Sequence, residues 1–195
     1  NMIFNMIPRA SVSAERINEV LDTELSIHDG NIDAKLEQSG CMEFKDVSFY
    51  YPEATTPALS HISFTANKGQ TIAFIGSTGS GKSTIINLMM RFYDPSSGSI
   101  AVDGVDIKDY KQNNLREKMG YASQQAILFT GTIRSNIAYA KKDIEEKVRR
   151  AVRIAQADDF VSHKEGDINA KITRGGTNVS GGQKQRLSVA RAVYR

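Results

Sequence analysis

Cysteine is nearly absent from the sequence and tryptophan is absent altogether. The 195 residues include one cysteine, Cys41, so no disulfide can form within the chain. This fits a reducing, cytosolic compartment. No apolar run approaches the ~18 residues of a membrane-spanning helix, and no signal peptide is expected. The chain itself is therefore predicted to be soluble.

The sequence also lacks a strong excess of charge of either sign. Its 25 basic and 22 acidic residues leave a net charge of +3, spread along the chain. A nucleic-acid partner is not indicated, because such partners select dense basic surfaces. A hydrophobic content of 40% over 195 residues supports one domain with a proper core and is too little for two full domains.

The most informative stretch is GSTGSGKST, from Gly76 to Thr84, which fits the pattern GxxxxGK[ST] at every fixed position. The apolar run 71–75 before it predicts a strand buried in a parallel sheet. The apolar residues after it continue without glycine or proline until Asp94-Pro95, which predicts a helix that the proline ends. A strand, a glycine loop and a helix in this order form the context that a phosphate-binding loop requires.

Each residue type in this loop has a chemical reason. Glycines lack a Cβ, so the backbone N–H groups can approach a polyphosphate closely. Lys82 adds a full charge to the partial positive charge of a helix N-terminus, and Ser83 offers a hydroxyl to Mg²⁺. An ordinary Gly/Ser-rich connection has no use for Lys-Ser after the last glycine. The candidate phosphate-binding residues are Gly76, Ser77, Thr78, Gly79, Ser80, Gly81, Lys82, Ser83 and Thr84.

The N-terminal residues look cut from something longer. Pro8 is predicted to end whatever precedes it, and Ser13 to cap a short helix with one apolar side. The polar stretch from Leu25 to Gly40 predicts a linker, which places the domain boundary near Gly40.

Short strands are predicted next, from Met42 to about Ala66, and another over 99–102. Tyr50 and Tyr51 stand between the first two strands. An aromatic ring at the edge of a phosphate site can stack on a base, although composition alone favours two strand tyrosines that pack locally.

A helix is predicted to begin at Asp143, whose side chain would form a capping box with Glu146. The spacing of its residues predicts one buried stripe and one basic face that is exposed to solvent. The buried stripe comprises Ile144, Val148, Ala151, Val152 and Ala155, and the basic face comprises Lys147, Arg149, Arg150 and Arg153.

Two further stretches leave alternatives open. Gln124 and Gln125 end an apolar run, where an amide either coordinates a metal or lies on the surface. Near the end of the chain, Ser180, Gly181 and Gly182 precede a predicted helix. These residues form either a second anion site or a simple helix cap.

These residues carry a resemblance to a known family. VSGGQ, at Val179, Ser180, Gly181, Gly182 and Gln183, resembles the signature sequence of ABC ATPases, whose usual form begins with Leu. This resemblance implies that these five residues contact ATP bound to a second ABC ATPase domain, in a head-to-tail homo- or heterodimer. FYYP is similar to the family's FxYP pattern, which implies that Tyr51, and not Tyr50, stacks on adenine. GYASQQAILF matches the Q-loop, which implies that Gln124 reaches Mg²⁺ and the attacking water.

The resemblance covers residues 41–195, and residues 1–40 look like the connector that leaves the last membrane helix of exporters with a fused ATPase domain. LFTGTIRSNIAYA is also exporter-like. The resemblance therefore implies ATP binding and hydrolysis that power export, at the cytoplasmic face of the cell membrane, with a fused or associated membrane domain.

Two departures from the family pattern stand out. Many exporters read like VGERG before the signature, whereas this chain has Ile172 to Gly176 with the basic Arg174, a pattern that resembles some heterodimeric exporters. The sequence also stops at Arg195, before the family's Walker B motif, catalytic glutamate and switch histidine. The catalytic base is therefore expected to be absent from these residues.

The predicted fold is an α/β P-loop NTPase core with a mostly parallel sheet, incomplete at the C-terminus. It includes a small antiparallel β part over 42–66 and a helical part, from about Tyr139 to Val161, with the signature. Two alternative functions stay open: a soluble ABC ATPase with no transport role, and the binding-only, degenerate half of a heterodimeric exporter.

Overall fold

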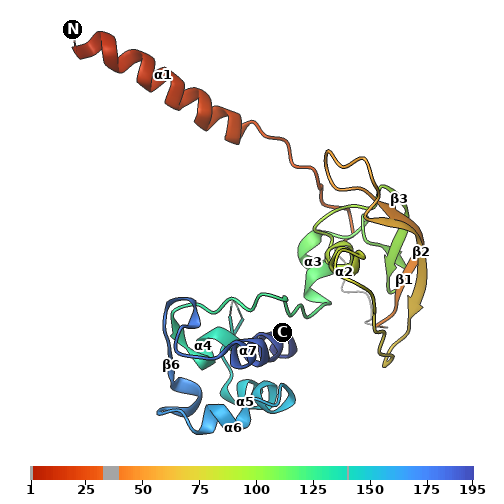
Figure 1. The fold of residues 1–195 in the computed structure, drawn as a ribbon, viewed down its shortest axis with the longest axis vertical. Helices are drawn as coiled ribbons and strands as arrows, with labels where there is room; N and C mark the ends of the chain where they lie inside the picture. Colours follow the sequence, from red (N-terminus) through yellow and green to blue (C-terminus); the bar gives the residue numbers. More distant parts are fainter. Residues whose placement is uncertain (1, 33–39, 140) are drawn as a thin grey trace.

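The computed structural model describes residues 2–32, 40–139 and 141–195, which form two bodies and a projecting helix (Figure 1). The first body contains a four-stranded antiparallel sheet in the order β2-β1-β3-β4. Phe44 of β1 lies opposite Phe64 of β2, and their stacked rings are 4.5 Å apart. The predicted antiparallel part over 42–66 is confirmed, and the predicted strand over 99–102 lies within β3. The strands are β1 (Met42–Phe49), β2 (Leu59–Ala66), β3 (Ser97–Val102) and β4 (Val105–Asp106).

Two helices, α2 (Lys82–Met89) and α3 (Gln112–Glu117), accompany this sheet (Figure 1). In β3 the side chains alternate, so Ile100 and Val102 are buried while their neighbours are less so. In β1 the register shifts between Phe44 and Val47, and both of these residues are buried. They form one hydrophobic cluster with the buried side of α2. Its fully buried members include Phe44, Val47, Leu88, Ile100, Ile107, Tyr110 and Leu115. The sheet thereby fixes the direction of α2, at whose N-terminus the glycine loop ends.

The second body is mostly helical and has its own core. Its helices are α4 (Ile133–Ile137), α5 (Glu145–Ile154), α6 (Asp158–Ser162) and α7 (Gly181–Tyr194). Shorter elements complete it: β5 (Gly131–Thr132) pairs with β6 (Lys171–Ile172), and the 3₁₀ turns are η1 (Asp167–Asn169) and η2 (Arg174–Gly176). The predicted stripe on α5 is confirmed for Val148, Ala151, Val152 and Ala155, which are buried while the basic residues are exposed. Ile144, its predicted first member, is half-buried and precedes the helix as its N-cap.

The predicted capping box of α5 is wrong. The helix begins at Glu145, after the N-cap residue Ile144, and no side chain caps it. Asp143 instead accepts a hydrogen bond from Arg134 Nε at 2.8 Å, and Arg134 also donates to Glu145 at 2.9 Å. Arg134 Nε lies within hydrogen-bond distance of both oxygens of the Asp143 carboxylate, so this carboxylate is held by a guanidinium and not by the start of α5.

The prediction of a parallel-sheet strand over 71–75 is also wrong for the described residues. This segment has no sheet pairing, and Ile75 is 95% exposed. A parallel strand is stable when neighbouring strands pair with its edges and helices cover its faces. No described strand pairs with 71–75, so the mostly parallel core sheet does not form among these residues. The parallel pairing found in the described ranges is a bridge between Ile32 and Tyr110.

The helix after the glycine loop ends earlier than predicted. It stops at Met89 and not at Pro95, because Arg91 adopts a left-handed conformation with φ of +50°. The turn is closed by the Phe92 N–H, which donates to Asn87 O at 2.9 Å. The long-range bonds of Arg91 that hold this turn are not readable from the local sequence.

The first helix, α1 (Met2–Leu21), runs through Pro8 without interruption. The predicted break at Pro8 and the predicted cap at Ser13 are therefore wrong. Proline fixes φ near the helical value and removes one hydrogen bond, so the helix continues at a cost. Ser13 lies inside it and donates to Arg9 O at 2.9 Å.

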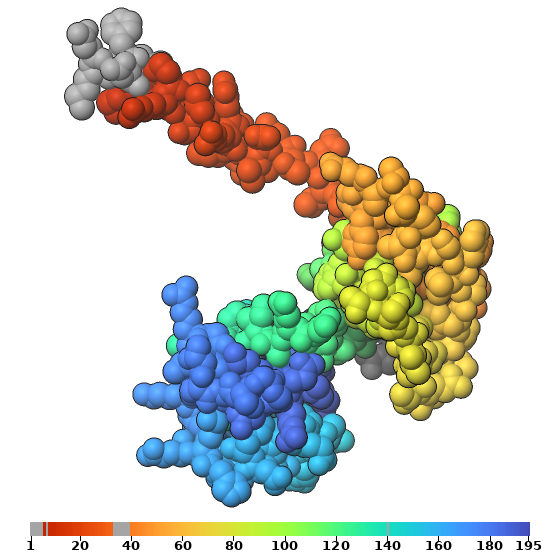
Figure 2. Space-filling view, in the orientation of Figure 1, coloured from red at the N-terminus to blue at the C-terminus, as the bar shows by residue number. Residues whose placement is uncertain are grey.

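Figure 2 shows α1 projecting away from both bodies. Its exposed apolar residues include Met6, Val12, Ile17, Val20 and Leu21. Among the described residues, no helix has the length and apolar character that crossing a membrane requires.

The segment after α1 returns to the first body. The Gly30 N–H donates to Tyr110 O at 3.0 Å, and the Ile32 N–H donates to Asp109 O at 2.9 Å. Gln112 N donates to the Asp29 carboxylate, and this bond lowers the pKa of Asp29 below its usual value. Part of the predicted linker is therefore held against the domain. Residues 33–39 of that linker lie outside the described residues, and the boundary near Gly40 stays a prediction.

The core of the second body predicts a large effect for one substitution. Leu187 on α7 is 1% exposed, and Leu187→Ala is expected to lower the free energy of unfolding by about 2–5 kcal/mol. Ile154 on α5 is 51% exposed, and Ile154→Ala is expected to change it by no more than about 0.5 kcal/mol. Urea denaturation measures both, and equal losses would contradict this placement of the core.

Candidate functional site

The glycine loop enters α2 through two residues in the left-handed region. Gly79 and Gly81 both have φ of +85°. At Gly81, a Cβ would lie 2.7 Å from Ala58 O and 2.7 Å from Leu59 Cδ2. Glycine is therefore required there for its conformation and for space. Gly76 is not left-handed; a Cβ there would lie 2.6 Å from Ser80 Oγ, so it is glycine for space alone.

The N-terminus of α2 is open to an anion. Its N-cap is Gly81, no side chain caps it, and its first turn contains no acidic residue. The helix is held from behind by the buried Thr84, Ile85 and Leu88. The first N–H groups of a helix carry partial positive charge and lack intrahelical partners. Their direction here suits a phosphate.

Lys82 places a full positive charge at the loop. Its Nζ donates to Gly76 O at 2.9 Å, to Ser77 O at 2.7 Å and to Ser80 Oγ at 3.2 Å. The ammonium group thus lies across the loop from which it comes. An ammonium and free N–H groups on one concave backbone favour a multiply charged anion.

The loop forms one wall of a pocket of about 390 Å³. The pocket brings together most of the residues that the sequence singled out, from three separate segments. Its lining consists of Tyr51, Ala58, Thr78, Gly79, Ser80, Gly81, Lys82, Ser83, Thr84 and Gln124. Gly76 and Ser77 contact the site through their bonds to Lys82. The predicted loop residues and Gln124 are therefore neighbours in space.

Tyr51 lines this pocket and Tyr50 does not. The Tyr51 hydroxyl is 3.1 Å from Thr84 Oγ1, which ties it to the first turn of α2. Its ring makes edge contacts with Phe49 at 4.9 Å and with Tyr93 at 5.3 Å. Tyr50 is 44% exposed. The Tyr51 ring is therefore held in place at the edge of the pocket.

No cluster of three or more His, Cys, Asp and Glu side chains suited to a metal occurs within the described ranges. The two predicted Mg²⁺ ligands, Ser83 and Gln124, both line the pocket and are exposed. A hydroxyl and an amide oxygen are hard ligands of the type that Mg²⁺ accepts, together with phosphate oxygens and water. The donor set fits a metal that arrives with a phosphate.

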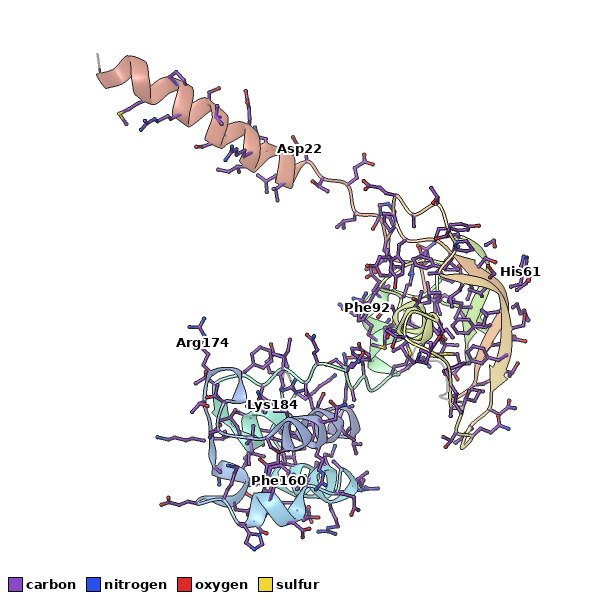
Figure 3. The ribbon with its side chains drawn as sticks, in the orientation of Figure 1. Asp22, His61, Phe92, Phe160, Arg174 and Lys184 are labelled. Atoms are coloured by element: carbon purple, nitrogen blue, oxygen red, sulfur yellow. The ribbon has the colours of Figure 1, made fainter. Side chains whose placement is uncertain are left out.

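The predicted signature residues lie in the second body, at the start of α7, near Lys184 in Figure 3. Ser180 is the N-cap: its Oγ accepts from Gln183 N at 3.3 Å, and its N–H donates to Gln183 Oε1 at 3.0 Å. The cap is therefore real. Gly181 and Gly182 are exposed, with open space where a Cβ would stand. The structure does not bring this group into the pocket of the glycine loop.

The turn before the signature is held by hydrogen bonds. Asn178 Oδ1 accepts from Thr173 N at 3.2 Å, and Asn178 Nδ2 donates to Lys171 O at 2.7 Å. Lys184 Nζ donates to Gly175 O at 2.8 Å. Arg174 points outward from this turn (Figure 3). The basic residue that departs from the family pattern is therefore presented on a fixed loop.

Arg191 on α7 is a functional-site neighbour that the sequence pattern did not indicate. Its Nε donates to Asn136 O at 2.8 Å, and its Nη1 donates to Ile127 O at 3.0 Å. Its guanidinium also lies near the stacked rings of Phe129 and Tyr139, 5.6 Å and 5.7 Å from their centroids. Burial lowers the pKa of Arg191. No local pattern marks contacts to residues so distant in sequence.

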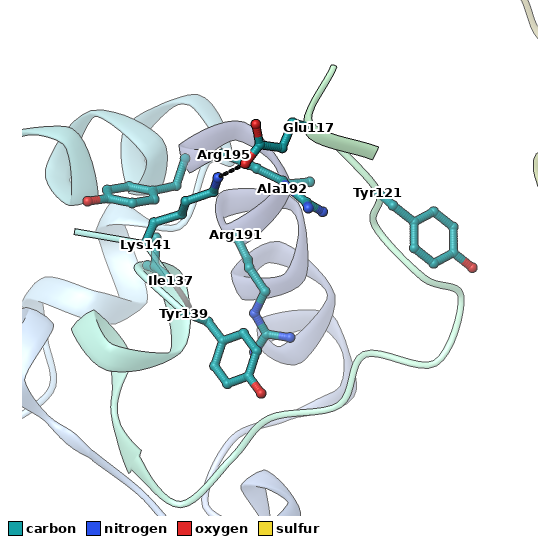
Figure 4. Close-up of a pocket in the computed structure, with 9 residues that line it drawn as sticks. Glu117, Tyr121, Ile137, Tyr139, Lys141, Arg191, Ala192 and Arg195 are labelled. Carbon is teal, nitrogen blue, oxygen red and sulfur yellow. Dashed lines mark hydrogen bonds and ion pairs between the residues drawn. The ribbon is translucent and has the colours of Figure 1, made fainter. Parts of the chain in front are cut away.

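Arg191 also lines a second pocket, of about 360 Å³, drawn in Figure 4. Glu117 of α3 and Lys141 form an ion pair of 3.1 Å across its edge. Gly120 permits the close approach of the two bodies here, because a Cβ would lie 2.4 Å from Ala192 O. The pocket therefore marks where the first body meets α7.

Comparison with known proteins identifies the class to which this fold and pocket belong. A family model described as ABC transporter matches residues 59–195, so the chain belongs to that family. The resemblance deduced from the signature and the predicted α/β P-loop class are thereby confirmed. Membership in this family implies that the chain binds ATP.

Individual relatives show which proteins of the ABC transporter family the chain is similar to. The chain is 40% identical over 195 residues to an ATP-dependent lipid A-core flippase of Vibrio vulnificus, covering 99% of this chain and 33% of the relative. It is 42% identical over 192 residues to an uncharacterised ABC transporter ATP-binding protein, YfiC, of Bacillus subtilis, and this match covers 97% of this chain and 32% of YfiC. The structure of a bacterial Atm1-family ABC exporter with ATP bound matches with a TM-score of 0.87 at 32% identity, covering 99% and 34%. The chain thus spans about a third of the length of these proteins.

The loop geometry predicts unequal effects for two glycine substitutions. Gly81 and Gly104 have φ of +85° and +80°, but only Gly81 has atoms within 4 Å of a Cβ position. Gly104→Ala is expected to cost about 1–2 kcal/mol of conformational strain. Gly81→Ala is expected to cost more and to weaken Mg-ATP binding, because the added methyl group pushes the loop away from β2. Urea denaturation and calorimetry measure the two effects, and equal results for the two variants would contradict the geometry.

Proposed function

We propose that this chain is the ATP-binding part of an ABC exporter, in which ATP binding and hydrolysis drive export across a membrane. The observation that carries the proposal is the single pocket shared by the glycine loop, Lys82, Tyr51 and Gln124. The relatives named as a flippase and as an exporter support it. Both matches cover 99% of the chain and so include the N-terminal segment, which favours export over a soluble ABC ATPase with no transport role.

The phosphates of ATP fit the loop by charge and by space. Lys82 and the N–H groups at the start of α2 supply positive charge on one side of the pocket. Gly81 lets the loop pack closely against Ala58 and Leu59, because a side chain there would meet both of them. We assign phosphate binding to Gly76 through Thr84, with Lys82 closest to the terminal phosphates. ATP, when bound, supplies the phosphoanhydride bond whose hydrolysis powers the transporter.

The other pocket residues orient the nucleotide. Tyr51 offers its ring to adenine, held by the bond to Thr84 and by the rings of Phe49 and Tyr93. Ser83 and Gln124 would hold Mg²⁺, and Gln124 would also orient the attacking water. The described residues that line the pocket include no carboxylate and no histidine. We therefore assign binding and orientation, and no general base, to these residues.

The signature residues would serve a second ABC ATPase domain. Gly181 and Gly182 are exposed at the N-terminus of a 14-residue helix, where a partner's phosphate can approach the backbone. We propose that Val179, Ser180, Gly181, Gly182 and Gln183 complete the ATP site of a partner in a head-to-tail homo- or heterodimer. Residues 1–40 would connect to a membrane domain, which places the ATPase part at the cytoplasmic face of the membrane.

Replacing Lys82 with Ala tests the proposed function. The change removes the ammonium group from the loop and a charge-assisted contact worth about 1.5–3 kcal/mol, so Mg-ATP affinity is expected to fall roughly ten- to hundredfold. Lys147→Ala, at an exposed position on α5, is the matched control and leaves the affinity unchanged. Calorimetry with Mg-ATP measures both variants. Equal affinities of Lys82→Ala and the unaltered chain would refute the site.

A further inference from the structure

A buried arginine joins three segments of the first body. The Arg91 side chain is 3% exposed. Its Nε donates to the Asp94 carboxylate at 2.9 Å, its Nη1 donates to Tyr110 O at 3.2 Å, and its Nη2 donates to His28 O at 2.9 Å. The planar guanidinium is suited to this role because it has donors in several fixed directions.

On one side, Arg91 belongs to the end of the phosphate-loop helix. It directly follows Met90, the C-cap of α2, and its N–H donates to Leu88 O at 3.0 Å. Arg116 of α3 donates to Met90 O at 3.3 Å and to Arg91 O at 3.1 Å. This end of α2 is therefore held by side chains, while its other end carries the glycine loop.

On the other side, Arg91 contacts the segment that leads from α1. His28 O is a backbone acceptor, so the bond depends on the position of the chain and not on a side chain. Gly30 fixes that position, because a Cβ there would lie 2.1 Å from Asp109 O. The Gly30 and Ile32 N–H groups complete the attachment to Tyr110 O and Asp109 O. We call residues 27–32 the docked segment.

We infer that Arg91 is a positioning residue through which the phosphate loop and the docked segment, and hence α1, are energetically coupled. The inference rests on the proposed function, because ATP is the ligand that acts on the loop. The proposed connection runs within a single chain, from Lys82 along α2 and through Arg91 to His28.

The physical basis is that the buried guanidinium cannot lose a partner cheaply. A helix of eight residues is about 12 Å long and moves as one body. A shift at its N-terminus therefore reaches Arg91, whose acceptors lie on separate segments. Leaving a buried charge without an acceptor is costly, so the docked segment follows. Such coupling is reciprocal: a change in docking alters ATP affinity by the same factor.

Hydrogen exchange at single amides tests the coupling in a protein that contains Asn1 to Arg195. The probes are the Gly30 and Ile32 N–H groups, whose exchange reports the opening of the docked segment. In the unaltered protein, saturating Mg-ATP is expected to slow their exchange about fivefold or more, the lower end of coupling between sites. Arg91→Lys keeps the positive charge but loses the branched set of guanidinium N–H donors. This variant is expected to abolish the slowing of exchange by Mg-ATP.

A second variant changes the docked segment and tests the effect on ATP binding. Gly30→Ala forces the docked segment off Asp109 without altering Arg91 or the loop. By reciprocity, its Mg-ATP affinity is expected to fall about fivefold or more. Asn31→Ala, at an exposed position in the same segment, is the control and leaves both exchange and affinity unchanged. If Arg91→Lys does not fold, Gly30→Ala still tests the coupling between the docked segment and the phosphate loop.

The outcomes separate the two proposals. Failure of the unaltered protein to bind Mg-ATP would remove the proposed function and this inference together. Binding of Mg-ATP with unchanged exchange at Gly30 and Ile32 would overturn the inference alone. Normal ATP affinity in Gly30→Ala, with its docked segment exchanging freely, would overturn it as well.

Discussion

The left-handed turn at Gly81 is the constraint on which the pocket depends. Its backbone lies against Ala58 and Leu59 of the sheet, with no space for a side chain. This contact sets where α2 begins, and the burial of Leu88 against β1 and β3 sets its direction. The free N–H groups and Lys82 consequently face the pocket. Thr84, one turn along, then holds Tyr51 at its edge. A change at this turn would therefore displace Lys82 and Tyr51 together.

Local patterns in the sequence predicted the elements whose stability is local. The glycine loop, the buried stripe of α5 and the helix after Ser180 follow from residue spacing, and all three are present. The prediction of a strand over 71–75 was wrong because a parallel strand depends on partners elsewhere in the chain, and no described strand pairs with this segment. The predicted helix break at Pro8 was wrong because one proline weakens a helix without having to end it.

The contacts made by two arginines were not predictable from local patterns. Arg91 ends α2 early because its side chain reaches His28 and Tyr110, far apart in sequence. Arg191 similarly joins α7 to Ile127 and Asn136. Arg91 links the loop helix to the N-terminal segment within the first body, and Arg191 links the signature helix to the chain after Gln124. The two cores meet elsewhere, where Gly120 lies against Ala192 O and Glu117 pairs with Lys141.

Amide NMR with two ligands tests most directly whether the glycine loop recognises phosphate. ATP is expected to shift the amide signals from Gly76 to Thr84, with the largest changes at Gly79, Gly81 and Lys82, where N–H groups line the pocket. Adenosine at equal occupancy is expected to shift signals near Tyr51 and to leave those of Gly79 and Gly81 in place. Loop signals that respond equally to both ligands, or to neither, would contradict the account.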